Sequence, residues 1–167
     1  LNGYLYYNRD HTRKTEVVFG YKFDILDYKI YFPMRKERRF LHNNPDILQG
    51  YNQLPESTSR QPMVVITKAM KDVMCLHEFG IPAIAPMSET SVVTDSVLED
   101  LIGQYEHVFA LYDRDRVGKC ALLNLRARGV TPLMMPKGTT KDFSDLCKQN
   151  ISEAQELVQR TLDLYSI

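Results

Sequence analysis

Two acidic side chains follow an apolar segment in the second half of the chain at a spacing suited to metal binding. Residues 108–112 are apolar, Asp113 and Asp115 come directly after them, and Gly118 stands where a helix would begin. Two carboxylates two residues apart on extended backbone can point the same way and share a hard cation such as Mg²⁺. Taken alone, the pair is equally compatible with an acidic turn in which Asp115 caps a helix.

The same arrangement recurs along this half of the chain. Three other apolar segments are each followed by one or two carboxylates, which are Asp72 after residues 63–66, Glu89 after residues 81–85, and Asp142 with Asp145 after residues 130–135. An Asp-rich loop often only caps a helix. Carboxylate oxygens nevertheless suit Mg²⁺ or Mn²⁺, and two aspartate pairs on neighbouring segments together favour a metal site.

Strands and helices alternate in the part of the sequence that carries these acids. The expected strands are residues 63–66, 81–85, 108–112 and 130–135, and the expected helices are residues 71–79, 94–105, 118–128 and 152–165. This alternation predicts an α/β fold with a mainly parallel sheet and helices on both faces. Ligands of such sheets bind beyond the carboxyl ends of the strands, and the acids follow those ends.

The first third of the chain has a different character. Residues 1–60 are rich in aromatic and β-branched side chains and predict short strands in a small β-rich N-terminal subdomain. We place an α/β domain at residues 61–150 and a C-terminal helix at residues 151–167. The most basic stretch offers candidate nucleic-acid-binding residues, which are Arg35, Lys36, Arg38 and Arg39. A solvated turn with its neighbouring aromatic side chains in the core is the alternative.

Composition narrows the classes of protein. The formal net charge is zero, so a nucleic-acid surface would require local charge separation. The three cysteines are scattered and form no C-x-x-C pair, which argues against a zinc site and a disulfide framework. No apolar run is long enough for a membrane span, so we expect a cytoplasmic protein without a membrane partner.

The ordered motifs resemble the Toprim family. A strand ends in the D-x-D-x-x-G sequence of residues 113–118, and the K-D-x-x-D-L sequence of residues 141–146 follows. The resemblance implies that Asp113, Asp115 and Asp142 bind metal, with Asp145 beside them, and that Asp72 closes the first turn. Residues 50–55 and 66–74 are similar to phage-type DNA primases with a DnaG-like polymerase core.

The chain departs from the family pattern in its first turn. Lys68 stands where the family has a glutamate used for acid–base work, and Ala69 replaces the family's glycine. Lys68 could hold a phosphate as a point charge, act as a base if its pKa were low, or mark an inactive domain. Glu89 could supply the missing carboxylate. We therefore take Lys68, Asp72 and Glu89 as candidate catalytic residues.

The resemblance implies a DNA primase that synthesises short RNA primers on single-stranded DNA with Mg²⁺ or Mn²⁺. Lys71 and Lys141 lie beside the acids and either bind nucleoside triphosphates (NTPs) or only balance charge. The expected partners are single-stranded DNA template, NTPs and a replicative helicase. The alternatives are a non-catalytic nucleic-acid-binding Toprim module of a replication assembly and a Toprim nuclease.

Overall fold

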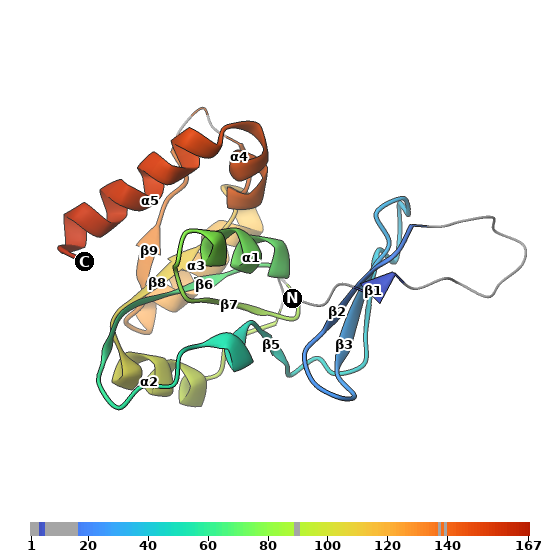
Figure 1. Cartoon of the computed structure of the whole chain (residues 1–167), viewed down its shortest axis with the longest axis horizontal. Helices are drawn as coiled ribbons and strands as arrows, with labels where there is room; N and C mark the ends of the chain where they lie inside the picture. Colours follow the sequence, from blue (N-terminus) through green and yellow to red (C-terminus); the bar gives the residue numbers. More distant parts are fainter. Residues whose placement is uncertain (1–3, 6–16, 89–90, 137, 139) are drawn as a thin grey trace, which may run out of the picture. The chain divides into compact units, whose positions relative to one another are not determined.

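The computed structural model describes residues 4–5, 17–88, 91–136, 138 and 140–167. The chain divides into two compact units, Leu1–Ile47 and Leu48–Ile167, drawn in Figure 1. We call them the small unit and the large unit. No helix in the described ranges is long and apolar enough to cross a membrane.

The small unit is an antiparallel sheet with strands in the order β1-β2-β3-β4. The strands are β1 (Tyr4–Leu5), β2 (Phe19–Lys22), β3 (Tyr28–Tyr31) and β4 (Phe40–His42). Val18 and Phe32 provide its buried apolar side chains. The expected β-rich subdomain before the α/β domain is confirmed, and the basic residues lie in the turn between β3 and β4.

The large unit is a five-stranded sheet in the order β5-β7-β6-β8-β9, with helices on both faces (Figure 1). Its strands are β5 (Leu48–Gln49), β6 (Gln61–Thr67), β7 (Ala83–Pro86), β8 (Tyr105–Leu111) and β9 (Thr131–Leu133). Its helices are the 3-10 turn η1 (Tyr51–Gln53), α1 (Met70–Glu78), α2 (Asp95–Gln104), α3 (Arg116–Ala127), α4 (Phe143–Gln149) and α5 (Ile151–Tyr165).

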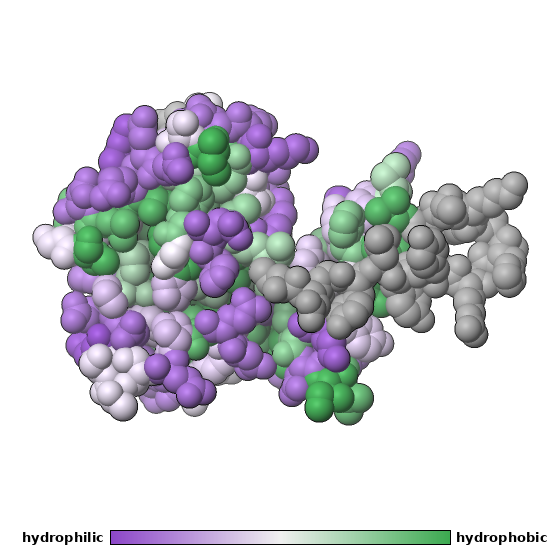
Figure 2. Space-filling view, viewed as in Figure 1, coloured by the Kyte–Doolittle hydropathy of each residue, from purple (hydrophilic) through white to green (hydrophobic). Residues whose placement is uncertain are grey.

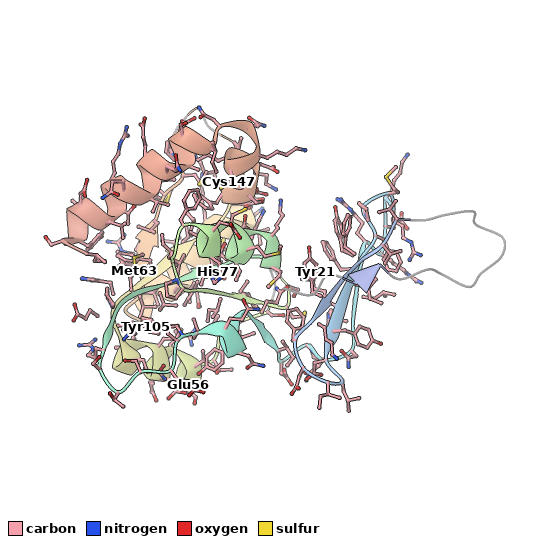
Figure 3. The ribbon with its side chains drawn as sticks, viewed as in Figure 1. Tyr21, Glu56, Met63, His77, Tyr105 and Cys147 are labelled. Atoms are coloured by element: carbon pink, nitrogen blue, oxygen red, sulfur yellow. The ribbon has the colours of Figure 1, made fainter. Side chains whose placement is uncertain are left out.

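Alternating side chains of the central strand β6 supply both faces of the core. Val64 and Ile66 belong to the cluster formed with α2 and α3, whereas Met63 and Val65 line the opposite face with side chains of α4 and α5. This period of two on an apolar strand is typical of a sheet covered on both sides. Tyr105, at the junction of α2 and β8, is almost fully buried and is labelled in Figure 3. The expected mainly parallel α/β fold is confirmed.

Turn chemistry sets the ends of the helices as the sequence predicts. The Thr94 side chain accepts a hydrogen bond from the Val97 amide and caps α2. Gly80 and Gly129 follow α1 and α3 with φ of 74° and 89°. Only glycine adopts this left-handed conformation without strain, so the two helices end there and the chain turns back toward the sheet.

Three short elements differ from the expectation. Strand β5 pairs antiparallel with β7, so residues 48–60 pack with the large unit and the two units meet at residues 47–48 rather than near residue 60. Strand β4 lies directly after the basic turn, and α4 occupies part of the expected acidic loop. Because β5, β4 and α4 span only two, three and seven residues, their sequences show no periodic pattern that marks them.

Figure 2 shows exposed apolar atoms on both units. On the small unit, Ile25 and Leu26 at the β2–β3 turn are 82% and 78% exposed. Exposed single apolar residues are ordinary on a protein surface.

Candidate active site

The candidate site lies where successive strands are added to opposite sides of the sheet. From β6 the chain passes through α1 to β7 on one side, and from β8 it passes through α3 to β9 on the other side. The neighbouring carboxyl ends of β6 and β8 therefore form a topological switch point, where open α/β sheets bind their ligands. Lys68 follows β6 and Asp113 follows β8, so both residues stand at this point.

Asp113, which follows β8, is buried, with 3% of its surface exposed. In the described part of the chain its two oxygens contact lysine ammonium groups, Oδ1 that of Lys68 and Oδ2 that of Lys141. The backbone of Asp113 also packs tightly against α3, because a Cβ on Gly118 would lie 2.2 Å from the Asp113 carbonyl oxygen. Glycine at this position lets the helix approach the strand end and thereby fixes Asp113.

The side chain of Lys68, in the turn after β6, contacts the carboxylates of Asp113 and Asp142. Its Nζ lies 2.5 Å from Asp113 Oδ1 and 3.1 Å from Asp142 Oδ2, and the side chain is 9% exposed. Burial disfavours its charge, but hydrogen bonding and charge from Asp113 and Asp142 outweigh burial and raise the pKa of Lys68. Carboxylates rather than cations surround it, so Lys68 lacks the low pKa that a general base requires.

Asp142 divides its two oxygens between a helix cap and two lysines. Oδ1 accepts hydrogen bonds from the Asp145 amide at 2.8 Å and the Ser144 hydroxyl at 2.9 Å. Oδ2 accepts hydrogen bonds from Lys68 and, at 2.9 Å, from Lys71. Burial acts to raise the pKa of Asp142, but the hydrogen bonds from Lys71, the Asp145 backbone and Lys68 hold this pKa well below its usual range.

Asp115 likewise uses one carboxylate oxygen to cap a helix and the other to contact a lysine. Oδ1 accepts from the Gly118 amide at 2.9 Å and caps α3, while Oδ2 lies 2.9 Å from Lys141 Nζ. The Gly118 hydrogen bond and then the Lys141 side chain lower the pKa of Asp115. Lys141 is also 3.2 Å from Asp113 Oδ2, so it bridges the two aspartates of the D-x-D sequence. The helix cap, which was one of the two alternatives for Asp115, is therefore present.

Asp72 ties the first turn to the acidic loop. Its Oδ1 accepts a hydrogen bond from the Ser144 amide at 3.0 Å, and its Oδ2 is buried without a hydrogen-bond partner. Desolvation, followed by the charge of Asp142, raises the pKa of Asp72 to about 6. The role of Ser144 in orienting both Asp72 and Asp142 was not foreseen, although its position in the K-D-x-x-D-L sequence was a signal.

The structure thus brings together six of the predicted site residues, which are Lys68, Lys71, Asp113, Asp115, Lys141 and Asp142. We call them, together with Asp72 and Asp145, the acidic cluster. Asp145 belongs to its edge, because its Oδ1 is 3.8 Å from Lys71 Nζ and its side chain is 51% exposed. Glu89 lies outside the described residues. The basic residues predicted to bind nucleic acid belong to the small unit.

The cluster fits a divalent cation at one position and not at another. Between Asp113 and Asp142 the ammonium of Lys68 occupies the space, and both oxygens of Asp142 already accept hydrogen bonds. Among the described side chains, no group of three metal-ligating residues is arranged to hold an ion. Between Asp113 Oδ2 and Asp115 Oδ2, however, only the 59% exposed Lys141 intervenes. One or two carboxylates completed by water and phosphate oxygens suffice for Mg²⁺.

The small unit carries a row of aromatic side chains, two of which, Tyr31 and Phe40, flank the basic turn in the sequence. Phe19, Tyr31 and Phe40 lie opposite one another on β2, β3 and β4, with ring centroids 6.2 Å and 4.8 Å apart. Phe19 and Phe40 are about half exposed, at 49% and 51%. We call these three side chains the aromatic row. Arg39 donates a hydrogen bond to the Tyr31 hydroxyl at 2.7 Å.

Comparison with known proteins identifies the fold. No family model and no curated protein sequence matches the chain. The DnaG primase catalytic domain bound to ssDNA is similar in structure, with a TM-score of 0.62 and 15% identity over 87% of this chain and 55% of that one. The E. coli primase catalytic core has a TM-score of 0.61 and 16% identity, with 87% and 55% covered. The primase fragment of the bacteriophage T7 primase-helicase has a TM-score of 0.64 and 14% identity, with 86% and 62% covered.

The chain has the fold of a Toprim-type primase core. The resemblance noted from the ordered acidic motifs is therefore confirmed at the level of the fold. The chain spans about half the length of the DnaG structures that it matches. Within this primase fold the acidic cluster occupies the switch point of the sheet, and the antiparallel sheet of the small unit precedes it in the chain.

Proposed function

We propose that the chain is the catalytic core of a DNA primase, which synthesises short RNA primers on single-stranded DNA with Mg²⁺ or Mn²⁺. The observation that carries this proposal is the carboxylate of Asp113. It is buried, its two oxygens lie against the ammonium groups of Lys68 and Lys141, and it faces Asp115 across Lys141 at the switch point of a primase fold. Such a group is suited to accept a cation and, through it, the phosphates of an NTP.

Six side chains of the acidic cluster have a role in this proposal. Asp113 and Asp115 would hold the divalent cation, which neutralises the charge that develops on the transferring phosphoryl group. Lys71 and Lys141 are 48% and 59% exposed, so their ammonium groups can turn to the phosphates of an incoming NTP as point charges. Asp142 keeps α4 and Lys68 in place, and Asp72 keeps the acidic loop against α1.

The small unit would bind the template strand. Its aromatic row presents two half-exposed rings, and the Arg39 guanidinium lies 5.4 Å from the centroid of the Tyr31 ring. Stacking of bases on aromatic rings, together with cations that follow the backbone, is how proteins bind single strands without sequence preference. A DnaG catalytic domain has been solved with ssDNA bound, which supports the same ligand for this chain.

Further partners follow from the primase proposal. NTPs are its substrates, and a replicative helicase is the proposed assembly partner, since the similar bacteriophage T7 fragment belongs to a primase-helicase protein. The cytoplasm of a bacterium, or of the host if a phage encodes the protein, remains the predicted location. These assignments concern the whole protein, of which the chain matches the catalytic core.

The decisive experiment supplies the protein with a single-stranded template, labelled NTPs and either Mg²⁺ or Mn²⁺. We expect short oligoribonucleotides, and we expect Asp115→Asn to reduce their formation by about a hundredfold, because metal stabilisation of phosphoryl transfer amounts to several kcal/mol. Asparagine still caps a helix, so α3 should persist in the variant. Asp100→Asn, an exposed change on α2, is the charge-matched control and should retain full activity.

Two results would contradict primer synthesis. Shortening of the template with no new RNA would indicate the nuclease alternative. Binding of the template without any product, with either ion, would indicate a non-catalytic nucleic-acid-binding module. The module is the second candidate, because the buried Lys68 replaces a carboxylate at the centre of the acidic cluster.

A further inference from the structure

The ammonium of Lys68 occupies the place of a cation in the acidic cluster. It lies between carboxylates from two different loops, 2.5 Å from Asp113 Oδ1 and 3.1 Å from Asp142 Oδ2. The side chain is 9% exposed, so it is directed at the carboxylates and not at solvent. A lysine that held a substrate phosphate would need an accessible ammonium, and Lys71 and Lys141 meet that requirement far better.

The charge balance of the acidic cluster also indicates that Lys68 takes the place of a cation. Its aspartates are Asp72, Asp113, Asp115, Asp142 and Asp145, and its lysines are Lys68, Lys71 and Lys141. Fully ionised, five aspartates and three lysines leave two negative charges, which a single divalent cation neutralises. Glutamate in place of Lys68 would add two more negative charges, the equivalent of a second divalent cation.

We infer that Lys68 is a built-in cation, which permanently fills one of two cation positions, so that this chain binds one divalent cation fewer than it would with a carboxylate at this position. Polymerase sites commonly hold two metal ions about 3.5–4 Å apart. Here the position between Asp113 and Asp142 belongs to Lys68, whereas the position between Asp113 and Asp115 is taken by Lys141, whose side chain is 59% exposed. The inference deepens the proposed function, because it concerns the same cluster.

Binding of Mn²⁺ to the whole chain tests the inference directly. Free Mn²⁺ is followed by its electron paramagnetic resonance signal while the wild-type protein and Lys68→Glu are titrated without nucleic acid or NTPs. We expect Lys68→Glu to bind about one Mn²⁺ per chain more than the wild-type protein. Equal numbers of bound Mn²⁺ in the two folded proteins would overturn the inference.

A charge-matched variant and a second measurement complete the test. Lys148→Glu makes the same change of charge at an exposed position of α4, and it should bind as many Mn²⁺ ions as the wild-type protein. If Lys148→Glu gained an ion as well, general attraction would be the cause and the inference would fail. If Lys68→Glu is unfolded without metal, circular dichroism replaces the titration. Millimolar Mn²⁺ should then restore its folded signal, and failure to do so would equally overturn the inference.

The outcome is independent of primer synthesis. An additional Mn²⁺ ion in Lys68→Glu supports the built-in cation even if neither protein makes primers, in which case only the proposed function fails. If the wild-type protein synthesises primers but binds as many Mn²⁺ ions as Lys68→Glu, the proposed function stands and the role assigned to Lys68 is wrong.

Discussion

Asp72 is the carboxylate of the acidic cluster that burial affects most clearly. Its Oδ2 is buried without a hydrogen-bond partner, and desolvation is the main reason why its pKa is raised to about 6. An ordinary aspartate in the unfolded chain titrates near pH 4. Between about pH 4 and pH 6 the folded state therefore binds more protons than the unfolded state, and Asp72 makes the protein less stable as the pH rises through this window.

Replacing Asp72 by asparagine should remove this penalty. The side-chain oxygen of asparagine can still accept the hydrogen bond from Ser144. We expect Asp72→Asn to raise the free energy of unfolding at pH 8 by roughly 3 kcal/mol, because the pKa of Asp72 is about 4 in the unfolded chain and about 6 in the folded one, and to leave it nearly unchanged at pH 4. Urea unfolding of both proteins at several pH values measures the difference. A gain that is equal at pH 4 and pH 8 would show that the titration of Asp72 is not its cause.

Lys68 shows how far residue types alone can be interpreted. Its position in the first turn indicated a departure from the family pattern, and several roles were open: phosphate ligand, base or mark of an inactive domain. The raised pKa of Lys68, caused by Asp113 and Asp142 against the effect of burial, disfavours a base at neutral pH. Its small exposure disfavours a phosphate ligand. Both observations depend on neighbours that are distant in the sequence.

At the scale of the elements, the close approach of α3 to β8 fixes the acidic cluster. A Cβ on Gly118 would lie 2.2 Å from the Asp113 carbonyl oxygen and 3.0 Å from its backbone nitrogen. These are backbone atoms, so no side chain can move to make room. The start of α3 would have to shift, and Asp113 and Asp115 would move with it.

We therefore expect Gly118→Ala to destabilise the protein by about 2 kcal/mol or more, because overpacking of this kind costs about 1–3 kcal/mol or higher. Thermal unfolding measures the effect. Gly103→Ala in α2 is the matched control, since no atom lies within 4 Å of its added Cβ and alanine should stabilise a helix by about 0.5–1 kcal/mol. Equal melting temperatures for the two variants would disprove the close approach.

Most elements of the large unit could be predicted from the sequence, the short strands β7 and β9 included, whereas β5 and α4 could not. Strands β6 and β8 and helices α1, α2, α3 and α5 lie where the apolar patterns place them. Helix α4 has seven residues and strand β5 only two, so neither contains enough of a repeat to be recognised. Tertiary contacts define them: β5 pairs with β7, and α4 begins at the cap that Asp142 provides.

At the scale of the whole molecule, the proposal requires a template-binding surface besides the acidic cluster. The chain has no net charge, so affinity for DNA must come from a local surface. The aromatic row and the neighbouring basic turn of the small unit provide both stacking faces and cations. Phe40 lies within this surface at 51% exposed, so its removal should cost little stability.

We expect Phe40→Ser to weaken binding of a labelled single-stranded oligonucleotide by about five- to a hundredfold, because stacking contributes about 1–3 kcal/mol per base. Arg39→Gln should in addition reduce the dependence of affinity on salt concentration. Fluorescence anisotropy at several salt concentrations measures both effects. Leu26→Ser removes an exposed apolar side chain from the same unit and should leave binding unchanged. If Phe40→Ser bound as tightly as the wild-type protein, the aromatic row would have no part in binding.

The α/β alternation and the placement of carboxylates after consecutive strands could be inferred from the sequence, because both depend on patterns within a few residues. Which charged side chains contact one another depends on the tertiary structure. Lys68 reaches Asp142 only because β6 and β8 are neighbours in the sheet and α4 begins beside them. Strand order and the packing of short helices arise from the burial of whole faces, so no local spacing reveals that a lysine lies between two of the predicted metal ligands.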